Sequence, residues 1–94
     1  METFDVVHVK EQGTDLIIVI VAPAFEFKAA ATQQALISRL TICAHNAGLA
    51  GTVVPVWPKG STFGFLAPTP WRPFFESFTP DLLAANVNTK LTCG

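Results

Sequence analysis

The side chains in this sequence that most readily take part in chemistry belong to two histidines, His8 and His45, and two cysteines, Cys43 and Cys93. Cys43 and His45 are two positions apart on a predicted helix, so their side chains point about 200° away from each other. By themselves they cannot act as a nucleophile and its base. His45 is more simply a polar side chain near a helix C-terminus, where the helix dipole favours its protonated form. We therefore predict no catalytic residue.

The seven carboxylates are dispersed along the chain, at Glu2, Asp5, Glu11, Asp15, Glu26, Glu76 and Asp81. No pair has a spacing that forces convergence, and no set of histidine, cysteine and carboxylate residues has the spacing of metal ligands. The two cysteines form no CxxC pair, and the glycines match neither the dinucleotide-binding nor the phosphate-loop fingerprint. We therefore predict no cofactor and no metal site.

The most distinctive segment runs from Trp57 to Phe78 and contains both tryptophans. It carries residue types that are enriched at protein interfaces, namely Trp71, Arg72, Phe74, Phe75 and Phe78. A stiff aromatic loop of this kind can anchor a protein partner or line an apolar pocket, and the pocket version would use Trp57, Phe65, Trp71 and Phe75. The simpler interpretation is that the phenylalanines cover the core of a small domain.

One stretch, residues 28–47, is long enough and free enough of proline and glycine to form a full-length helix. Its apolar positions predict a stripe facing the core, consisting of Ala29, Leu36, Leu40, Ala44 and Ala47. The opposite side carries Ala31, Ala35 and Ile42. These three residues are either good helix formers on an exposed surface or a second packing face, against another helix of this chain or of another copy.

Four segments have the composition of strands, at residues 4–9, 15–22, 51–57 and 62–67. Pro55 lacks a ladder donor, which predicts an edge position for the third of them. Thr79, Pro80 and Asp81 predict the start of a second helix that continues to about Leu91, with a strand over residues 87–93 as the alternative. The expected fold is α+β in ββαββα order, with a four-stranded, mainly antiparallel sheet and two helices packed on one face. Residues 1–94 should form a single domain.

The composition favours self-association. Hydrophobic residues make up 50% of the chain and charged residues 14%, whereas charged residues are roughly 25% of a typical soluble domain. The strand over residues 15–22 has no polar side, so both of its faces must be covered. With both helices on one face, the sheet face around Ile18 and Ile20 would be left for another subunit.

The six cations are scattered along the chain, so we expect no nucleic-acid binding. The longest apolar run is too short for a membrane helix, and no signal peptide is evident. We therefore expect no membrane association and a cytoplasmic location. Cys43 and Cys93 would then be reduced thiols, with Cys93 the exposed one, and a disulfide between them is the alternative.

These observations favour a small interaction or structural module that works as a homo-oligomer. The alternative is a binding protein for a small apolar or aromatic ligand, and an enzyme comes third. A protein partner or a small apolar ligand is therefore expected in addition to a second copy.

Overall fold

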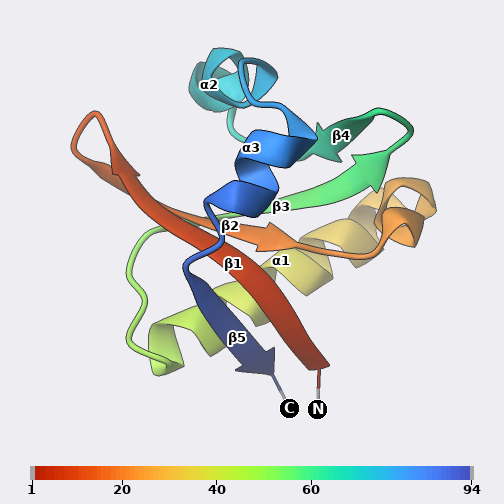
Figure 1. Cartoon of the computed structure of the whole chain (residues 1–94). Helices are drawn as coiled ribbons and strands as arrows, with labels where there is room; N and C mark the ends of the chain where they lie inside the picture. Colours follow the sequence, from red (N-terminus) through yellow and green to blue (C-terminus); the bar gives the residue numbers. More distant parts are fainter. Residues whose placement is uncertain (1, 94) are drawn as a thin grey trace.

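A computed structural model describes residues 2–93 of the chain and shows one mixed, five-stranded sheet in the order β4-β3-β2-β1-β5 (Figure 1). The strands are β1 (Glu2–Glu11), β2 (Thr14–Ile20), β3 (Thr52–Lys59), β4 (Thr62–Phe65) and β5 (Thr89–Cys93). β2 and β3 are parallel, and the other three pairs are antiparallel. The α+β class and the first four strands are confirmed, whereas the expected four-stranded sheet is wrong by one strand.

The first hairpin follows from its turn residues. Gln12 and Gly13 join β1 to β2 with φ values of +50° and +77°, and Glu11 lies opposite Thr14 in the register. A two-residue turn with both φ values positive matches the right-handed twist of the flanking strands. β2 then runs into a short 3-10 helix, η1 (Pro23–Phe27), and the long helix α1 (Ala30–Asn46), which crosses over to β3.

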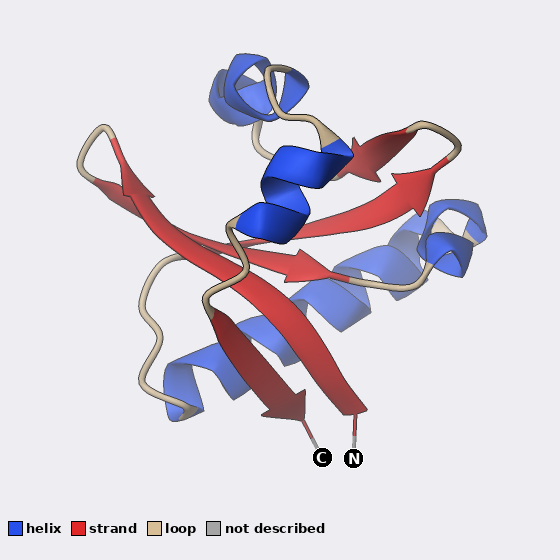
Figure 2. Cartoon of the chain, in the orientation of Figure 1, coloured by secondary structure: helices blue, strands red, loops and turns tan. Residues whose placement is uncertain are grey.

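The helices cover both faces of the sheet, not one face as expected (Figure 2). α1 lies on one face, while the other is covered by α2 (Arg72–Glu76) and α3 (Pro80–Ala85), which follow the 3-10 helix η2 (Thr69–Trp71). Six of the seven prolines lie between Pro55 and Pro80. They divide this part of the chain into short helical turns that fold back over the sheet.

The second predicted helix is shorter than expected, because α3 ends at Ala85 and β5 follows. The side-chain Nδ2 of Asn86 donates to the Leu82 carbonyl at 2.7 Å, at the end of α3. Two residues later, Asn88 Nδ2 donates to the His8 carbonyl at 2.8 Å, and Asn88 Oδ1 accepts from the His8 amide at 2.9 Å. Asn88 therefore joins the ladder of β1, and the alternative of a C-terminal strand is the correct one.

β2 is a central strand whose two faces belong to two separate cores. Ile17 and Val19 face α1, whereas Leu16 and Ile18 face α2 and α3. All four are fully buried, so the sheet face around Ile18 and Ile20 is covered by this chain and is not left for another subunit. The accessible surface of 5462 Å² is also close to the roughly 5,300 Å² expected of a folded monomer of this size.

β3 lies inside the sheet, so the edge position predicted from Pro55 is wrong. The Pro55 carbonyl accepts from the Leu66 amide at 3.2 Å, and the β3–β4 register begins one residue later, at Val56 and Phe65. The proline therefore stands opposite Leu66 at the end of this ladder, where it takes part through its carbonyl alone.

Candidate functional site

The four residues expected to line an aromatic pocket lie on opposite faces of the sheet. Trp57 packs in the core under α1, whereas Phe65, Trp71 and Phe75 pack in the core under α2 and α3. They line no common pocket, because Trp57 and Phe65 stand at adjacent positions of the β3–β4 ladder whose side chains alternate between faces.

The aromatic side chains between Phe65 and Phe78 cover the core on one face of the sheet. Phe75 is fully buried, and its ring centroid lies 5.4 Å from Phe65 and 5.2 Å from Phe74. Phe78 continues the cluster at 4.9 Å from Phe74, and Trp71 meets Phe74 edge-on at 5.9 Å. These distances fall in the range of favourable aromatic pairs. Arg72 extends from α2 into solvent, with its guanidinium 3.9 Å from Glu76.

The side of α1 that faces away from the sheet carries exposed apolar residues between two polar edges. Ala31 and Ala35 are exposed on it, and Ile42 is 64% exposed. Phe27, just before the helix begins, is 84% exposed. The predicted core stripe is only partly correct, because Leu40 and Ala44 are buried, Leu36 is half-buried, and Ala29 and Ala47 are exposed.

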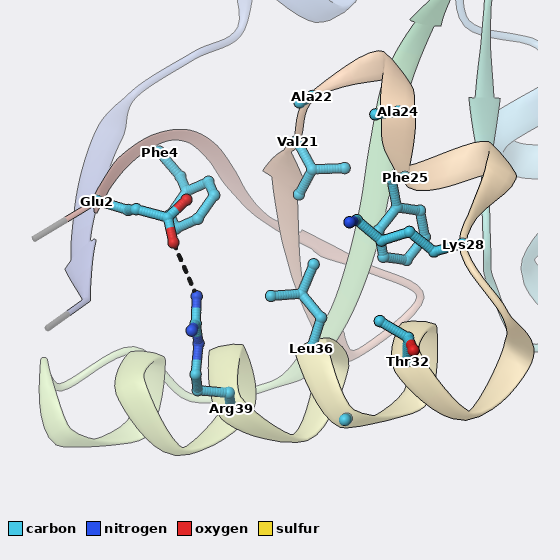
Figure 3. Close-up of a pocket in the computed structure, with 11 residues that line it drawn as sticks. Glu2, Phe4, Val21, Ala22, Ala24, Phe25, Lys28, Thr32, Leu36 and Arg39 are labelled. Carbon is cyan, nitrogen blue, oxygen red and sulfur yellow. Dashed lines mark hydrogen bonds and ion pairs between the residues drawn. The ribbon is translucent and has the colours of Figure 1, made fainter.

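A groove of about 510 Å³ lies between the N-terminal half of α1, η1 and the ends of β1 and β2 (Figure 3). Its apolar walls come from Phe4 of β1, Val21 after β2, Phe25 of η1 and Leu36 of α1. The space stays open because the other apolar positions around it are alanines, at Ala22, Ala24 and Ala35. Methyl groups are too short to bridge a helix and a sheet.

The charges of the groove are mostly positive. Figure 3 shows Glu2 and Arg39 toward one end and Lys28 toward the other. Arg39 Nη2 donates to Glu2 Oε1 at 3.0 Å, so the one carboxylate of the lining is already engaged. Within residues 2–93, no carboxylate lies within 4 Å of Lys28. An anion entering the groove would therefore meet an unneutralised ammonium group.

The η1 wall is fastened to β3 by Glu26. Its Oε1 accepts from Lys59 Nζ at 3.0 Å and from Trp57 Nε1 at 3.3 Å. These two hydrogen bonds, that of Lys59 first, hold the pKa of Glu26 below its usual range because they favour the charged carboxylate. Behind the wall, the rings of Phe25 and Trp57 are 5.0 Å apart. Trp57, expected in a pocket, thus supports the groove from behind.

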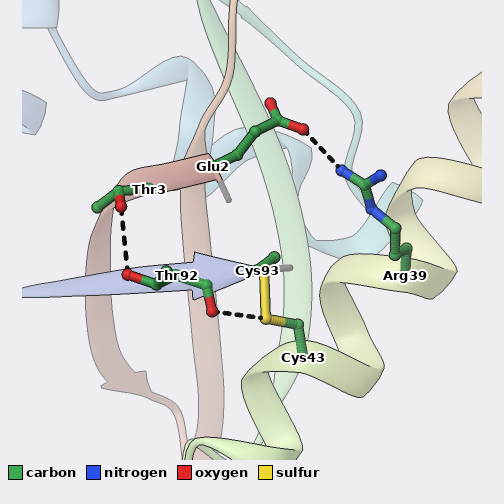
Figure 4. The surroundings of a disulfide bond; sticks show 6 residues. All are labelled: Glu2, Thr3, Arg39, Cys43, Thr92 and Cys93. Carbon is green, nitrogen blue, oxygen red and sulfur yellow. Dashed lines mark hydrogen bonds and ion pairs between the residues drawn. A yellow bond between two sulfur atoms is a disulfide. The ribbon is translucent and has the colours of Figure 1, made fainter.

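A disulfide joins Cys43 of α1 to Cys93 of β5, with their Cα atoms 5.9 Å apart (Figure 4). The expectation of two reduced thiols is therefore wrong, and Cys93 is the buried member of the pair. The two cysteines meet because the end of β5 lies beneath the C-terminal part of α1. A lasting disulfide is typical of oxidising compartments, so the cytoplasmic location stays a prediction.

A second hollow, of about 480 Å³, lies over the disulfide and between α1 and β5. Its lining includes Ile42, Asn46 and Thr92, and Arg39 borders both this hollow and the groove. The Glu2–Arg39 ion pair thus stands between two depressions along one flank of α1. Figure 4 shows this ion pair beside the disulfide.

The histidines lie near the loop between α1 and β3. His8 Nε2 is 3.2 Å from the Ala50 carbonyl oxygen, and His45 Nε2 is 3.4 Å from that of Gly51. Both distances fit a ring N–H that donates to a loop carbonyl. In the part of the chain that the structure describes, no three histidine, cysteine or carboxylate side chains gather as metal ligands would, and no polar side chain is buried.

The groove itself escaped prediction. The helix wheel places Lys28, Thr32 and Arg39 along one polar edge of the helix, but it gives no sign that this edge overhangs the sheet. A usable signal was the concentration of alanines within residues 22–35, the segment that also contains Phe25 and Phe27. Small side chains at a helix–sheet contact leave space unfilled.

No protein-family model, curated protein or solved structure matches this chain. Among residues 2–93, none of the helices has the length and apolar character needed to cross a membrane.

Proposed function

We propose that this protein is a small interaction module that associates with a second copy of itself through the outer side of α1. We call this surface the α1 ridge; it consists of Ala31, Ala35 and Ile42 on α1, together with Phe27, the last residue of η1, which precedes the helix. The observation that carries the proposal is the exposure of Phe27 and Ile42, at 84% and 64%. Two large, exposed apolar side chains, one just before the helix and one in its second half, are typical of an interaction surface.

The ridge is complementary to itself. Ala31 and Ile42 are separated by about 16 Å along the helix axis, and Ala35 lies near the middle of the ridge. In an antiparallel pair with its two-fold axis near Ala35, Ile42 of one copy lies toward the N-terminal end of the other helix, which Phe27 precedes. Alanines then meet at the crossing, where small side chains allow close approach. A twofold contact requires this kind of self-complementarity.

The size of the ridge limits the expected affinity of the dimer. Stable protein interfaces bury about 800 Å² on each partner, and one face of a helix of 17 residues supplies less than that. α1 also carries no carboxylate, so its one arginine, Arg39, finds no acidic partner on the facing helix. We therefore propose a dimer that is populated in a concentration-dependent way, with the low charge content of the chain as further support.

The test compares Ile42→Lys with Leu82→Lys by sedimentation velocity over a wide concentration range. Leu82 is the matched control, because it is 45% exposed but lies on α3, on the other side of the sheet. The wild-type protein and Leu82→Lys should show a mass that rises with concentration, whereas Ile42→Lys should stay monomeric. A wild-type protein that is monomeric throughout, or an Ile42→Lys variant that still associates, would refute the proposal.

A further inference from the structure

We propose that the groove beneath α1 is a binding site for amphipathic carboxylates, that is, molecules with an apolar tail and one carboxylate head. The tail would lie against Phe4, Phe25 and Leu36, and the head would bind Lys28. This site borders the α1 ridge and shares Ala35 with it, but its aromatic walls and its lysine lie on the flank of the helix and on the sheet end below it. The inference does not depend on the proposed dimer.

The apolar part of the argument rests on the walls. The groove volume of about 510 Å³ lies within the roughly 300–1,000 Å³ of typical small-molecule sites. Phe25 and Val21 are buried beneath it, while Phe4 and Leu36 are half-buried and present their remaining surface to it. An aliphatic or arylalkyl tail would remove this surface from water, together with the tail's own.

The charged part of the argument selects the head group. Two cations and one anion border the groove, and the anion, Glu2, is held by Arg39 at 3.0 Å. Lys28 keeps its donors free of any carboxylate within residues 2–93. A carboxylate at Lys28 forms a charge-assisted hydrogen bond, whereas a cationic head would meet like charge at Lys28 and a carboxylate that is already paired at Glu2. A neutral head gains the tail contacts alone.

The polar end of the site is distinct from its apolar middle. Figure 3 shows Lys28, Phe25 and Thr32 toward the end of the groove away from Glu2 and Arg39, with Leu36 between the two ends and the Lys28 ammonium pointing toward the middle. A ligand with a single charged end therefore has one preferred orientation, with its head at Lys28. The Glu2–Arg39 pair closes the other end, beyond which the second hollow begins.

The first experiment titrates three ligands with the same tail, namely decanoate, decan-1-ol and decyltrimethylammonium, below their micelle concentrations. Amide chemical shifts in two-dimensional NMR spectra give both the affinity and the position of each ligand. Decanoate should bind in a saturable way and shift the amides of η1, the first half of α1 and the first residues of β1. Decan-1-ol should bind more weakly at the same place, and the ammonium ligand should bind most weakly.

The second experiment separates the head from the tail. Lys28→Gln should weaken decanoate binding about tenfold, as expected for the loss of a charge-assisted bond, and should leave decan-1-ol binding unchanged. Lys10→Gln is the matched control, because Lys10 is another exposed lysine without an ion pair in the described chain. Ala24→Trp, which fills the groove from η1, should abolish the binding of both ligands.

Three results would overturn the inference. The first is an absence of saturable decanoate binding to a folded protein. The second is equal weakening of decanoate and decan-1-ol by Lys28→Gln, since the lysine would then not recognise the head. The third is a pattern of shifts centred on α2 and α3, which would place the ligand on the other side of the sheet. The same spectra show directly whether each variant is folded.

Discussion

The two faces of the sheet are covered in different ways. Under α2 and α3, aromatic rings fill the space between short helices and strands, with Phe75 fully buried at the centre. Under α1, only the middle and end of the helix pack closely, through Leu40 and Ala44. The first half of α1 instead overhangs a groove of about 510 Å³. The face under α2 and α3 is thus fully covered by packed side chains, whereas the face under α1 is covered only in part.

Side-chain size explains the difference. A phenylalanine on a short helix reaches the sheet even when the helix backbone is displaced, so irregular turns of chain can still make a dense core. An alanine gives a helix its stability but cannot fill the space beneath it. The α1 face is accordingly held at its margins, by the Cys43–Cys93 disulfide and by the hydrogen bonds of Glu26 to Lys59 and Trp57.

The sharpest test of this comparison is a pair of phenylalanine truncations. Phe75→Ala should lower the free energy of unfolding by about 3–5 kcal/mol, because it removes a fully buried ring and leaves an enclosed cavity. Phe25→Ala removes an equally buried ring at the wall of an open groove. It should cost about 1.5–3 kcal/mol, close to the transfer term alone. Urea unfolding of both variants measures the difference.

Equal losses for the two variants would contradict the comparison, since the groove side would then be packed as densely as the aromatic side. Phe27→Ala is the baseline, because this ring is 84% exposed and contributes little to the stability of a monomer. The measurements belong at low protein concentration, where an association through the α1 ridge does not add to stability.

The second prediction concerns the Cys43–Cys93 disulfide, which links α1 to β5. The cysteines are 50 residues apart, and closing a loop of that length stabilises a native fold by about 2–4 kcal/mol. Adding a phosphine reductant should therefore lower the midpoint of urea unfolding for the wild-type protein. A Cys43→Ser, Cys93→Ser double variant should resemble the reduced protein and show no response to the reductant.

Hydrogen exchange shows which elements are destabilised when the disulfide is reduced. Reduction should speed hydrogen exchange in β5 and in the second half of α1. The amides of α2 and α3 should keep their original exchange rates. A uniform change would mean that the disulfide supports the whole fold rather than one face. The mass of the unreduced protein after thiol alkylation shows in addition whether the bond is present in the cell, which bears on the expected cytoplasmic location.

Much of the fold was predictable from local patterns, and the site was not. The β-branched run at residues 15–22 and the proline-free stretch at residues 28–47 identify the central strand and α1 correctly, because each pattern is unambiguous over its own length. The fifth strand was harder. Leu83, Val87 and Leu91 recur at helical spacing, and only the pairing of Asn88 with His8 across 80 residues turns the end of this segment into a strand.

The groove illustrates the limit more clearly. Its walls come from residues 2 to 39 and from three different elements, so no single segment carries its pattern. Each wall residue has an ordinary local explanation, either as a strand end, a helix edge or a turn. The aromatic segment, by contrast, has an unusual composition that suggests a site. Its rings instead pack against the sheet. Composition indicated where large side chains lie, but it did not indicate where space is left over.

The last prediction tests the weakest of the contacts that hold the α1 face, namely the hydrogen bonds of Glu26 to Lys59 and Trp57. Because hydrogen bonds from Lys59 and then Trp57 hold the pKa of Glu26 below its usual range in the folded state, the unfolded chain binds the proton more readily. The stabilising contribution of Glu26 is therefore fully present above the usual glutamate pKa, and it is lost as the pH falls through the lower, folded-state pKa.

Relative to Glu26→Gln, the wild-type protein should accordingly lose stability between about pH 6 and pH 3, with a small effect because the side chain is partly exposed. Carbon-detected NMR of the Glu26 carboxyl gives its pKa directly. Lys59→Met should raise that pKa toward the usual value, and Lys10→Met should leave it unchanged. A Glu26 that titrates at the usual value in the wild-type protein would mean that η1 is not held to β3 by this contact. The groove wall would then depend on Phe25 alone, and the α1 face would be less firmly closed than its disulfide suggests.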